Sequence, residues 1–162
     1  MIIRPALPRD AAEIAEITNS IIRETLITFT TTERSHEEIA RDIDERGLAF
    51  QVAELDGRVA GYATYGRFRS GPGYAHSREH TILLAPEGRG RGAGRALIRA
   101  LEEVARSQGV HVLVAGISAE NPGAISFHAA VGFEAVGRMP EVGHKWGRWL
   151  DLVLMQKILA PE

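Results

Sequence analysis

A glycine-rich turn, set between a strand pattern and a helix pattern, constrains the fold of this chain most. The apolar run Thr81–Ala85 predicts a strand, and apolar residues recur at helical spacing from Leu97 to Val104. Between them stands Arg89-Gly90-Arg91-Gly92-Ala93-Gly94. Glycines let the backbone approach a phosphate with no Cβ in the way, and a helix N-terminus attracts anions. We therefore predict that a phosphate-bearing ligand binds near residue 90, with added positive charge from Arg89, Arg91 and Arg95.

The spacing of this turn excludes two common phosphate motifs. No Gly-Lys-Ser or Gly-Lys-Thr occurs, and Arg95 stands where a dinucleotide fingerprint needs its third glycine. The pattern that fits is R/Q-x-x-G-x-G/A, which resembles the pyrophosphate-binding segment of the GNAT superfamily of acetyl-CoA-dependent N-acetyltransferases. The alternative is a surface turn that binds nothing. The resemblance implies acetyl-CoA contacts at Leu83, Leu84, Ala85, Arg89, Gly90, Arg91, Gly92, Ala93, Gly94, Arg95 and Asn121.

Length and composition narrow the class of protein. The 162 residues suit a single domain over residues 1–162, and 44% apolar with 25% charged residues is typical of a globular chain. A formal net charge of −2 argues against a general nucleic-acid or membrane-surface binder. The absence of cysteine excludes disulfides and thiolate sites. Met1–Pro5 is too short and polar for a signal peptide, and no apolar run approaches the about 20 residues of a membrane span, so we expect a cytoplasmic protein.

Local signals predict the order β-α-α-β-β-β-α-β-α-β-β. Asp10 with Glu13 reads as a capping box, as does Ser35 with Glu38, and Asp56-Gly57 reads as a hairpin turn. This order predicts an α/β fold with helices on both faces of a mixed sheet, which the resemblance implies is mostly antiparallel. The predicted strands are Ile2–Arg4, Ala49–Leu55, Arg58–Tyr65, His80–Leu84, Val112–Ile117, Phe133–Val136 and Trp149–Met155, with helices after Asp10, Ser35, the glycine turn and Asn121.

Two further segments make the resemblance more specific. Asn121-Pro122 opens a helix that ends in Phe127-His128-Ala-Ala-Val-Gly132-Phe133, and Val142–Asp151 reads VGHKWGRWLD. Together with Glu79-His80-Thr81, they resemble the phosphinothricin and methionine sulfoximine acetyltransferases over nearly the whole chain. The chain departs from that subgroup at Leu83, where the subgroup usually has Tyr, and at Arg78, where it has an apolar residue. Many GNAT enzymes also have Tyr at the position of His128.

The resemblance implies acyl transfer from a thioester to an amine, which must lose a proton before it attacks. Glu79 is the candidate base, acting directly or through water, if its pKa is raised; the alternative is a solvated strand end. A backbone N–H in residues 82–85 is expected to stabilise the oxyanion. His128 is a candidate proton donor to the leaving thiolate or, equally, a structural histidine or a cofactor contact.

An amino-acid-like acceptor needs its carboxylate held and its side chain enclosed. Arg69, Arg78 and Lys145 are the candidate carboxylate ligands, each with the alternative of a solvated surface charge, and Phe29 is a candidate apolar wall. His80 is expected to structure its strand, and the histidine spacing predicts no metal site.

The leading hypothesis is an N-acetyltransferase for the α-amino group of a small amino-acid analogue. The alternatives are acetylation of a protein N-terminus or a polyamine, and a non-catalytic acyl-CoA-sensing module. We also predict a homodimer built around Val142–Asp151, with Trp146 or Trp149 at the interface or acceptor pocket and at least one of the two packed in the core.

Overall fold

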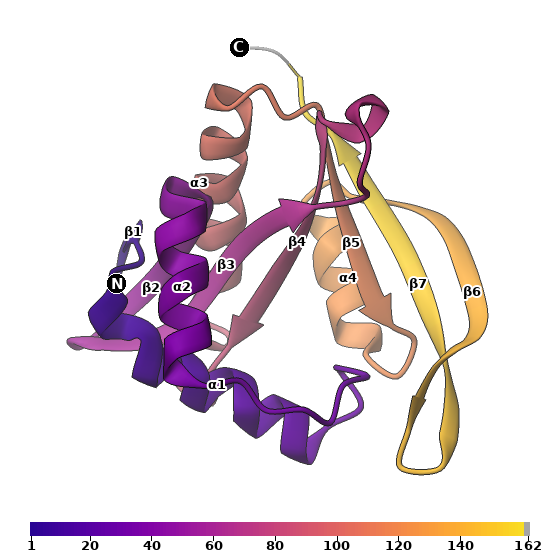
Figure 1. Ribbon diagram of the computed structural model, residues 1–162, viewed down its shortest axis with the longest axis horizontal. Coiled ribbons are helices and arrows are strands. Elements are labelled where there is room, and N and C mark those ends of the chain that lie inside the picture. Colours follow the sequence, from indigo (N-terminus) through magenta and orange to yellow (C-terminus); the bar gives the residue numbers. More distant parts are fainter. Residues whose placement is uncertain (161–162) are drawn as a thin grey trace.

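The computed structural model describes residues 1–160, in which one seven-stranded sheet runs through the molecule (Figure 1). The strand order is β1-β2-β3-β4-β5-β7-β6. Neighbouring strands are antiparallel except β4 and β5, which are parallel. The strands are β1 (Ile2–Pro5), β2 (Phe50–Leu55), β3 (Arg58–Arg67), β4 (Ser77–Leu84), β5 (Val112–Ser118), β6 (Glu134–Lys145) and β7 (Arg148–Ile158).

Helices cover both faces of this sheet. Helices α1 (Ala11–Glu24) and α2 (His36–Arg46) pack on one face through a cluster that includes Ile14 and Ile39. Helices α3 (Ala93–Ser107) and α4 (Pro122–Ala130) pack on the other. The predicted element order, the mixed and mostly antiparallel sheet and the helices on both faces are therefore confirmed. No helix within residues 1–160 is long and apolar enough to cross a membrane.

Of the two predicted capping boxes, one forms and the other does not. Ser35 Oγ accepts from the Glu38 N–H at 3.1 Å, and Glu38 Oε2 accepts from the Ser35 N–H at 3.0 Å, so this capping box is confirmed. The prediction of a capping box at Asp10 was wrong. The Asp10 carboxylate accepts from the Arg4 guanidinium and from the Leu7 N–H, each at 2.8 Å, and so ties β1 to the start of α1. Arg4 also lowers the pKa of Asp10, although burial opposes the shift.

Strand β6 is much longer than the predicted Phe133–Val136, because it continues to Lys145 and turns at Trp146-Gly147 into β7. Residues 134–142 are exposed on both faces, so they lack the apolar alternation that predicts a strand. The turn residues have φ of 53° and 70°, as a tight hairpin turn requires. Trp146 and Trp149 are 53% and 65% exposed, so the prediction that one of them packs in the core was wrong.

The feature that positions the site is the divergence of β4 from β5. The two strands pair only at Ser77–Glu79 against Val112–Val114, and both then continue past the last pair. In Figure 1 the two arrows separate toward their carboxyl ends. Backbone groups of β4 beyond Glu79 therefore face a gap in the sheet.

Candidate active site

Glu79 lies where β4 and β5 part. Its Oε1 is 3.9 Å from the point where a Cβ on Gly116 of β5 would stand, so the carboxylate lies beside the backbone of β5. The residue borders a cavity of about 250 Å³ that also touches Phe29 and Leu83. Although the side chain reaches solvent, the surrounding protein desolvates the carboxyl group and raises the pKa of Glu79. The predicted base therefore has both a cavity in front of it and the required direction of pKa shift.

The direction of the backbone N–H groups in β4 reduces the number of predicted oxyanion donors. The Ala85 N–H donates to the Ala60 carbonyl of β3 at 2.9 Å. N–H groups alternate in direction along a strand. The Leu83 N–H therefore also points toward β3, whereas the N–H groups of Ile82 and Leu84 point toward the gap. The Leu84 carbonyl on that side accepts from Arg89 at 3.4 Å. Of the N–H groups in residues 82–85, those of Ile82 and Leu84 therefore remain as candidate oxyanion donors, while the Leu83 side chain borders the cavity.

The glycine turn forms an open N-terminus for α3. Gly90 and Gly92 have φ of 70° and 80°, in the left-handed region that favours glycine. Gly92 is the N-cap residue and brings no side chain to cap the helix. The Ala96 N–H is bonded to the Gly92 carbonyl at 3.0 Å, so the N–H groups of residues 93–95 precede the first helical hydrogen bond. These donors and the basic side chains beside them fit a diphosphate.

Two other glycines near the turn serve packing. A Cβ on Gly94 would stand 3.1 Å from the Phe127 ring of α4, so this glycine lets α3 and α4 approach each other. A Cβ on Gly88 would stand 2.5 Å from the Ala60 carbonyl oxygen, so Gly88 lets the turn lie against β3. Sequence reasoning assigned Gly94 to ligand approach and missed Gly88, because neither close neighbour is near in the sequence.

His128 is buried on α4 and paired with His80 of β4. The two Nε2 atoms are 3.0 Å apart, and His128 Nδ1 is 2.8 Å from the Ala124 carbonyl oxygen. A carbonyl accepts only, so His128 Nδ1 carries a proton, and its Nε2 accepts from the Nε2–H of His80. His80 Nδ1 then has no partner among residues 1–160.

Burial keeps this pair neutral. It lowers the pKa of His80 to about 3 and also lowers the pKa of His128. Both nitrogens of His128 are therefore engaged in the neutral state, which favours the structural alternative for this residue over proton donation. The prediction that His80 structures its strand agrees with its packing against His128 and Phe133. No cluster of three or more metal-ligating side chains is present within the described residues 1–160.

Lys145 has a different role from the one predicted. Its side chain is buried, and Nζ donates to the carbonyl oxygens of Ile22, Thr25 and Thr28 at 2.8, 2.7 and 2.9 Å. Three carbonyls thus take the three ammonium protons, leaving none for an acceptor carboxylate. The assignment of Lys145 as a carboxylate ligand was wrong.

The two candidate arginines lie differently relative to Glu79. Arg78 precedes Glu79 in β4, so its side chain points to the opposite face, the one on which His80 packs against α4. Arg78 as a ligand beside Glu79 was therefore wrong. Arg69 lies exposed in the loop between β3 and β4, 5.8 Å from the Phe68 ring, and has no acidic partner in the described part of the chain. Asn121 borders the cavity and caps α4 by accepting from the Ala124 N–H at 3.2 Å.

Comparison with known proteins identifies the family of this chain. Residues 3–154 match the model of the acetyltransferase (GNAT) domain. The chain belongs to the GNAT acetyltransferase family. An L-amino acid N-acyltransferase of Escherichia coli K12 is 39% identical over 96% of this chain and 92% of its own length. A methionine sulfoximine/methionine sulfone acetyltransferase of Salmonella typhimurium LT2 is 40% identical over 96% and 93%. A phosphinothricin N-acetyltransferase of Streptomyces coelicolor is 32% identical over 97% and 95%.

Solved structures of GNAT enzymes share the whole fold. An acetyltransferase from Salmonella typhimurium with its cofactor acetyl-CoA superposes with a TM-score of 0.94 at 37% identity, over 100% of this chain and 95% of that one. A ribosomal-protein-alanine N-acetyltransferase from Brucella melitensis reaches 0.93 at 42% identity, over 98% and 100%. The predicted resemblance and the class, an acetyl-CoA-dependent acetyltransferase, are confirmed at the level of the GNAT family.

Proposed function

We propose that this GNAT enzyme transfers the acetyl group of acetyl-CoA to the α-amino group of a small amino-acid analogue. The observation that carries this proposal is Glu79, a carboxylate of raised pKa that borders a small cavity at the gap between β4 and β5. The relatives named for L-amino acids, methionine sulfoximine and phosphinothricin support this acceptor class.

The turn at residues 89–95 holds the diphosphate of acetyl-CoA in this proposal. The N–H groups at the start of α3 donate to the phosphate oxygens, and the arginines of the turn supply charge. The thioester then lies along β4 in the gap, where the N–H groups of Ile82 and Leu84 face it. One of these N–H groups stabilises the oxyanion that develops at the acetyl carbonyl.

Glu79 accepts the proton of the acceptor ammonium, directly or through a water molecule. The neutral amine attacks the thioester carbon, the carbon–sulfur bond breaks, and the attacking nitrogen loses its second proton to solvent, so that coenzyme A leaves as the thiolate. His128 does not supply a proton to it in this scheme, because both ring nitrogens are engaged. Its pairing with His80 instead holds α4 against β4.

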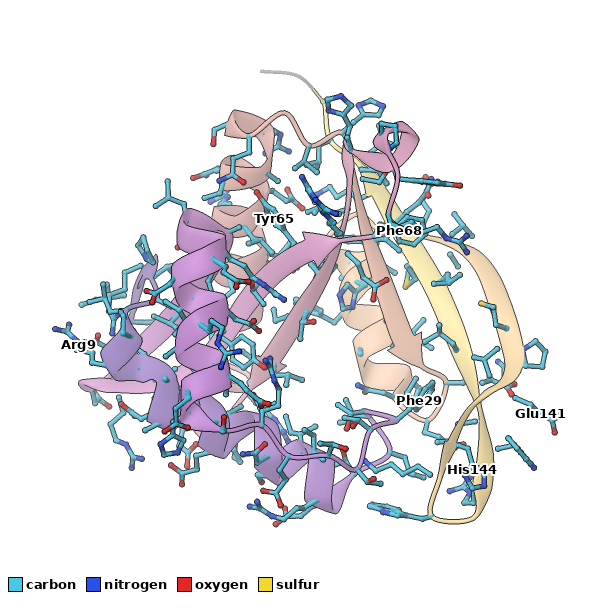
Figure 2. All side chains as sticks on the ribbon, in the orientation of Figure 1. Arg9, Phe29, Tyr65, Phe68, Glu141 and His144 are labelled. Atoms are coloured by element: carbon cyan, nitrogen blue, oxygen red, sulfur yellow. The ribbon has the colours of Figure 1, made fainter. Side chains whose placement is uncertain are left out.

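The acceptor enters from the side of the α1–α2 loop. Phe29 borders the cavity and supplies its apolar wall (Figure 2). Arg69, which lies in the β3–β4 loop with no acidic partner among residues 1–160, is the candidate ligand of the acceptor carboxylate. A bidentate guanidinium would orient the α-amino group toward Glu79.

A thiol-release assay with a panel of amines tests this function. We expect turnover with methionine sulfoximine and other free amino acids, and little with a polyamine, because Arg69 repels a second positive charge. A second acceptor class, a protein N-terminus, is favoured by the similarity to the Brucella ribosomal-protein-alanine enzyme. Faster turnover of an alanine-led peptide than of any free amino acid would favour that class. A chain that binds acetyl-CoA but releases no thiol with any amine would be an acyl-CoA-sensing module.

We further propose that two copies associate through the β6–β7 hairpin. Exposed apolar side chains gather there on the edge strand β6, in its turn and at the start of β7, which is an unusual surface for a monomer. We expect a dimer mass by light scattering at micromolar concentration, and a monomer mass would overturn this. Because Trp149 is exposed, Trp149→Ala should weaken association and leave the circular dichroism spectrum unchanged. The exposed apolar residues of the hairpin are Val136, Met139, Val142, Trp146 and Trp149.

The cytoplasmic location stays a prediction.

A further inference from the structure

The buried ammonium group of Lys145 joins two parts of the molecule that are far apart in sequence. Lys145 ends β6, whereas its acceptors are the carbonyl oxygens of Ile22, in the last turn of α1, and of Thr25 and Thr28 in the loop that follows. Thr28 Oγ1 is a further acceptor at 3.3 Å. The side chain is only 1% exposed, so water does not compete for these bonds.

The choice of lysine at this position is informative. Only two of the 19 basic residues of the chain are lysine. An ammonium is a compact point charge with three donors, whereas a planar guanidinium cannot direct its donors to three carbonyls around one point. A cation at a helix C-terminus also interacts favourably with the helix dipole, and the Ile22 carbonyl lies at the C-terminus of α1. The site is therefore built for one ammonium group.

A second contact fastens the same loop to the same strand. A Cβ on Gly143, two residues before Lys145, would stand 2.4 Å from Cδ2 of Phe29. The Phe29 ring thus lies directly on the backbone of β6, beside the hairpin (Figure 2). Gly143 and Lys145 point to one face of β6, and both are engaged by residues 25–29.

The segment held in this way is a wall of the active-site cavity. Ile27, Thr28 and Phe29 border the cavity that Glu79 and Leu83 border from β4. Neither attachment involves the glycine turn or α3, where the acetyl donor is bound. The position of this wall should therefore affect the acceptor and not the donor.

We infer that Lys145 is a positioning residue for the acetyl acceptor, acting as an ammonium clamp that holds residues 25–29 against the β6–β7 hairpin. This inference rests on the proposed function, which places the acceptor in this cavity. The clamp also connects the hairpin, the surface proposed to form the dimer, with the wall of the acceptor pocket.

The first test is a split between the two substrates. Lys145→Met keeps most of the side-chain volume and removes the donors. We expect kcat/KM for the amino-acid acceptor to fall by up to about 10²-fold, because displacement of a positioning wall by about 1 Å has effects of that size. The KM for acetyl-CoA should stay unchanged. Gly143→Ala, which displaces Phe29 by another route, should give the same split.

Lys157→Met is the matched control. Lys157 is the other lysine, and it too binds a carbonyl oxygen, that of Val131 at 2.9 Å, as well as Glu102 at 2.7 Å. It lies on the opposite face of the sheet, against α3 and α4. We expect Lys157→Met to lower thermal stability without changing the KM for the acceptor. An equal loss of acceptor kcat/KM in both lysine variants would mean that the effect of Lys145→Met comes from a general loss of stability, and it would overturn the inference.

The absence of cysteine allows a chemical rescue. Lys145→Cys introduces a single thiol, which can be alkylated in the unfolded chain with 2-bromoethylamine before refolding. The product has an ammonium at the same distance from the backbone as lysine, whereas 1-bromopropane gives a side chain of the same length without charge. Acceptor kcat/KM should return with the ammonium and not with the propyl group. Equal activity of the two products would overturn the clamp.

Hydrogen exchange separates failure of the clamp from failure of the proposed function. Without any substrate, amides of residues 25–32 should exchange at least about 10-fold faster in Lys145→Met than in the unchanged protein, and amides of α3 should not. Unchanged exchange in 25–32 would overturn the clamp even if the enzyme acetylates amino acids. Faster exchange with no acetylation of any amine would retain the clamp and overturn the proposed function.

Discussion

The proposed donor-binding and acceptor-binding sides of this enzyme are built in different ways. The donor side is one continuous stretch, from the end of β4 through the glycine turn into α3. The proposed acceptor side is assembled from the loop after α1, from β4 and β5, and from the β6–β7 hairpin that holds this loop. Backbone groups form most of the donor side, whereas side chains form the acceptor side. A donor shared by many enzymes can therefore be held by local geometry, while the acceptor is selected by contacts between distant segments.

The largest effect is expected at Glu79, where the two sides meet. Glu79→Gln keeps the shape of the side chain and removes the base. We expect kcat to fall by about 10²–10⁴-fold, the usual size of general-base catalysis, with unchanged acetyl-CoA affinity by calorimetry. Because burial raises the pKa of Glu79, activity should rise with pH as this carboxyl ionises, and that rise should be absent in the variant. An unchanged pH–rate profile in Glu79→Gln would remove Glu79 from the mechanism.

The second largest effect concerns stability in acid, through the His80–His128 pair, which borders the same cavity as Glu79. Burial lowers the pKa of His80 from 6.5 to about 3, so the unfolded chain binds this proton more readily than the folded protein does. The stability due to a neutral His80 is complete above pH 6.5 and is lost as the pH falls toward 3. The loss amounts to at most about 5 kcal/mol in the free energy of unfolding.

Urea unfolding at several pH values checks this loss. His80→Gln stays neutral throughout and should lose stability less steeply between pH 6.5 and 4 than the unchanged protein. His36 is exposed, so His36→Gln is the control and should leave the acid dependence as it was. Parallel pH dependence in His80→Gln and the unchanged protein would contradict a pKa shift of this size.

The difference between the two sides also explains what sequence reasoning could predict. The turn before α3 and Asn121 as the cap of α4 follow from residues adjacent in sequence, and both form as predicted. Lys145 and Arg78 were misassigned, because their orientation depends on carbonyls of α1 and on the face of β4 that each side chain occupies. The length of β6 was missed because its exposed residues carry no alternation. Packing between distant segments decides each of these cases.

Substitutions at two glycines on the donor side distinguish a role in ligand binding from a role in packing. A Cβ on Gly92 meets nothing within 4 Å, but its φ of 80° is unfavourable for other residues, by about 1–2 kcal/mol. Gly92→Val should therefore weaken acetyl-CoA binding, measured by calorimetry, with a modest loss of stability. Gly94→Val should lose about 1–3 kcal/mol of stability, because its side chain meets Phe127. Undiminished acetyl-CoA affinity in Gly92→Val would contradict the diphosphate site.

The smallest effect is expected at Arg78, and it tests how the acceptor side is oriented. Arg69→Ala should lower kcat/KM for a free amino acid by about 10–100-fold, since a hydrogen bond to a charged group contributes about 1.5–3 kcal/mol. The loss should shrink with the corresponding amino-acid amide, which lacks the carboxylate. Arg78→Ala should change neither value, because its side chain points to the opposite face of β4 from Glu79. If Arg78→Ala instead gave the larger and carboxylate-dependent loss, the acceptor would have to lie on the α3–α4 face, and the division between a donor side and an acceptor side would be wrong.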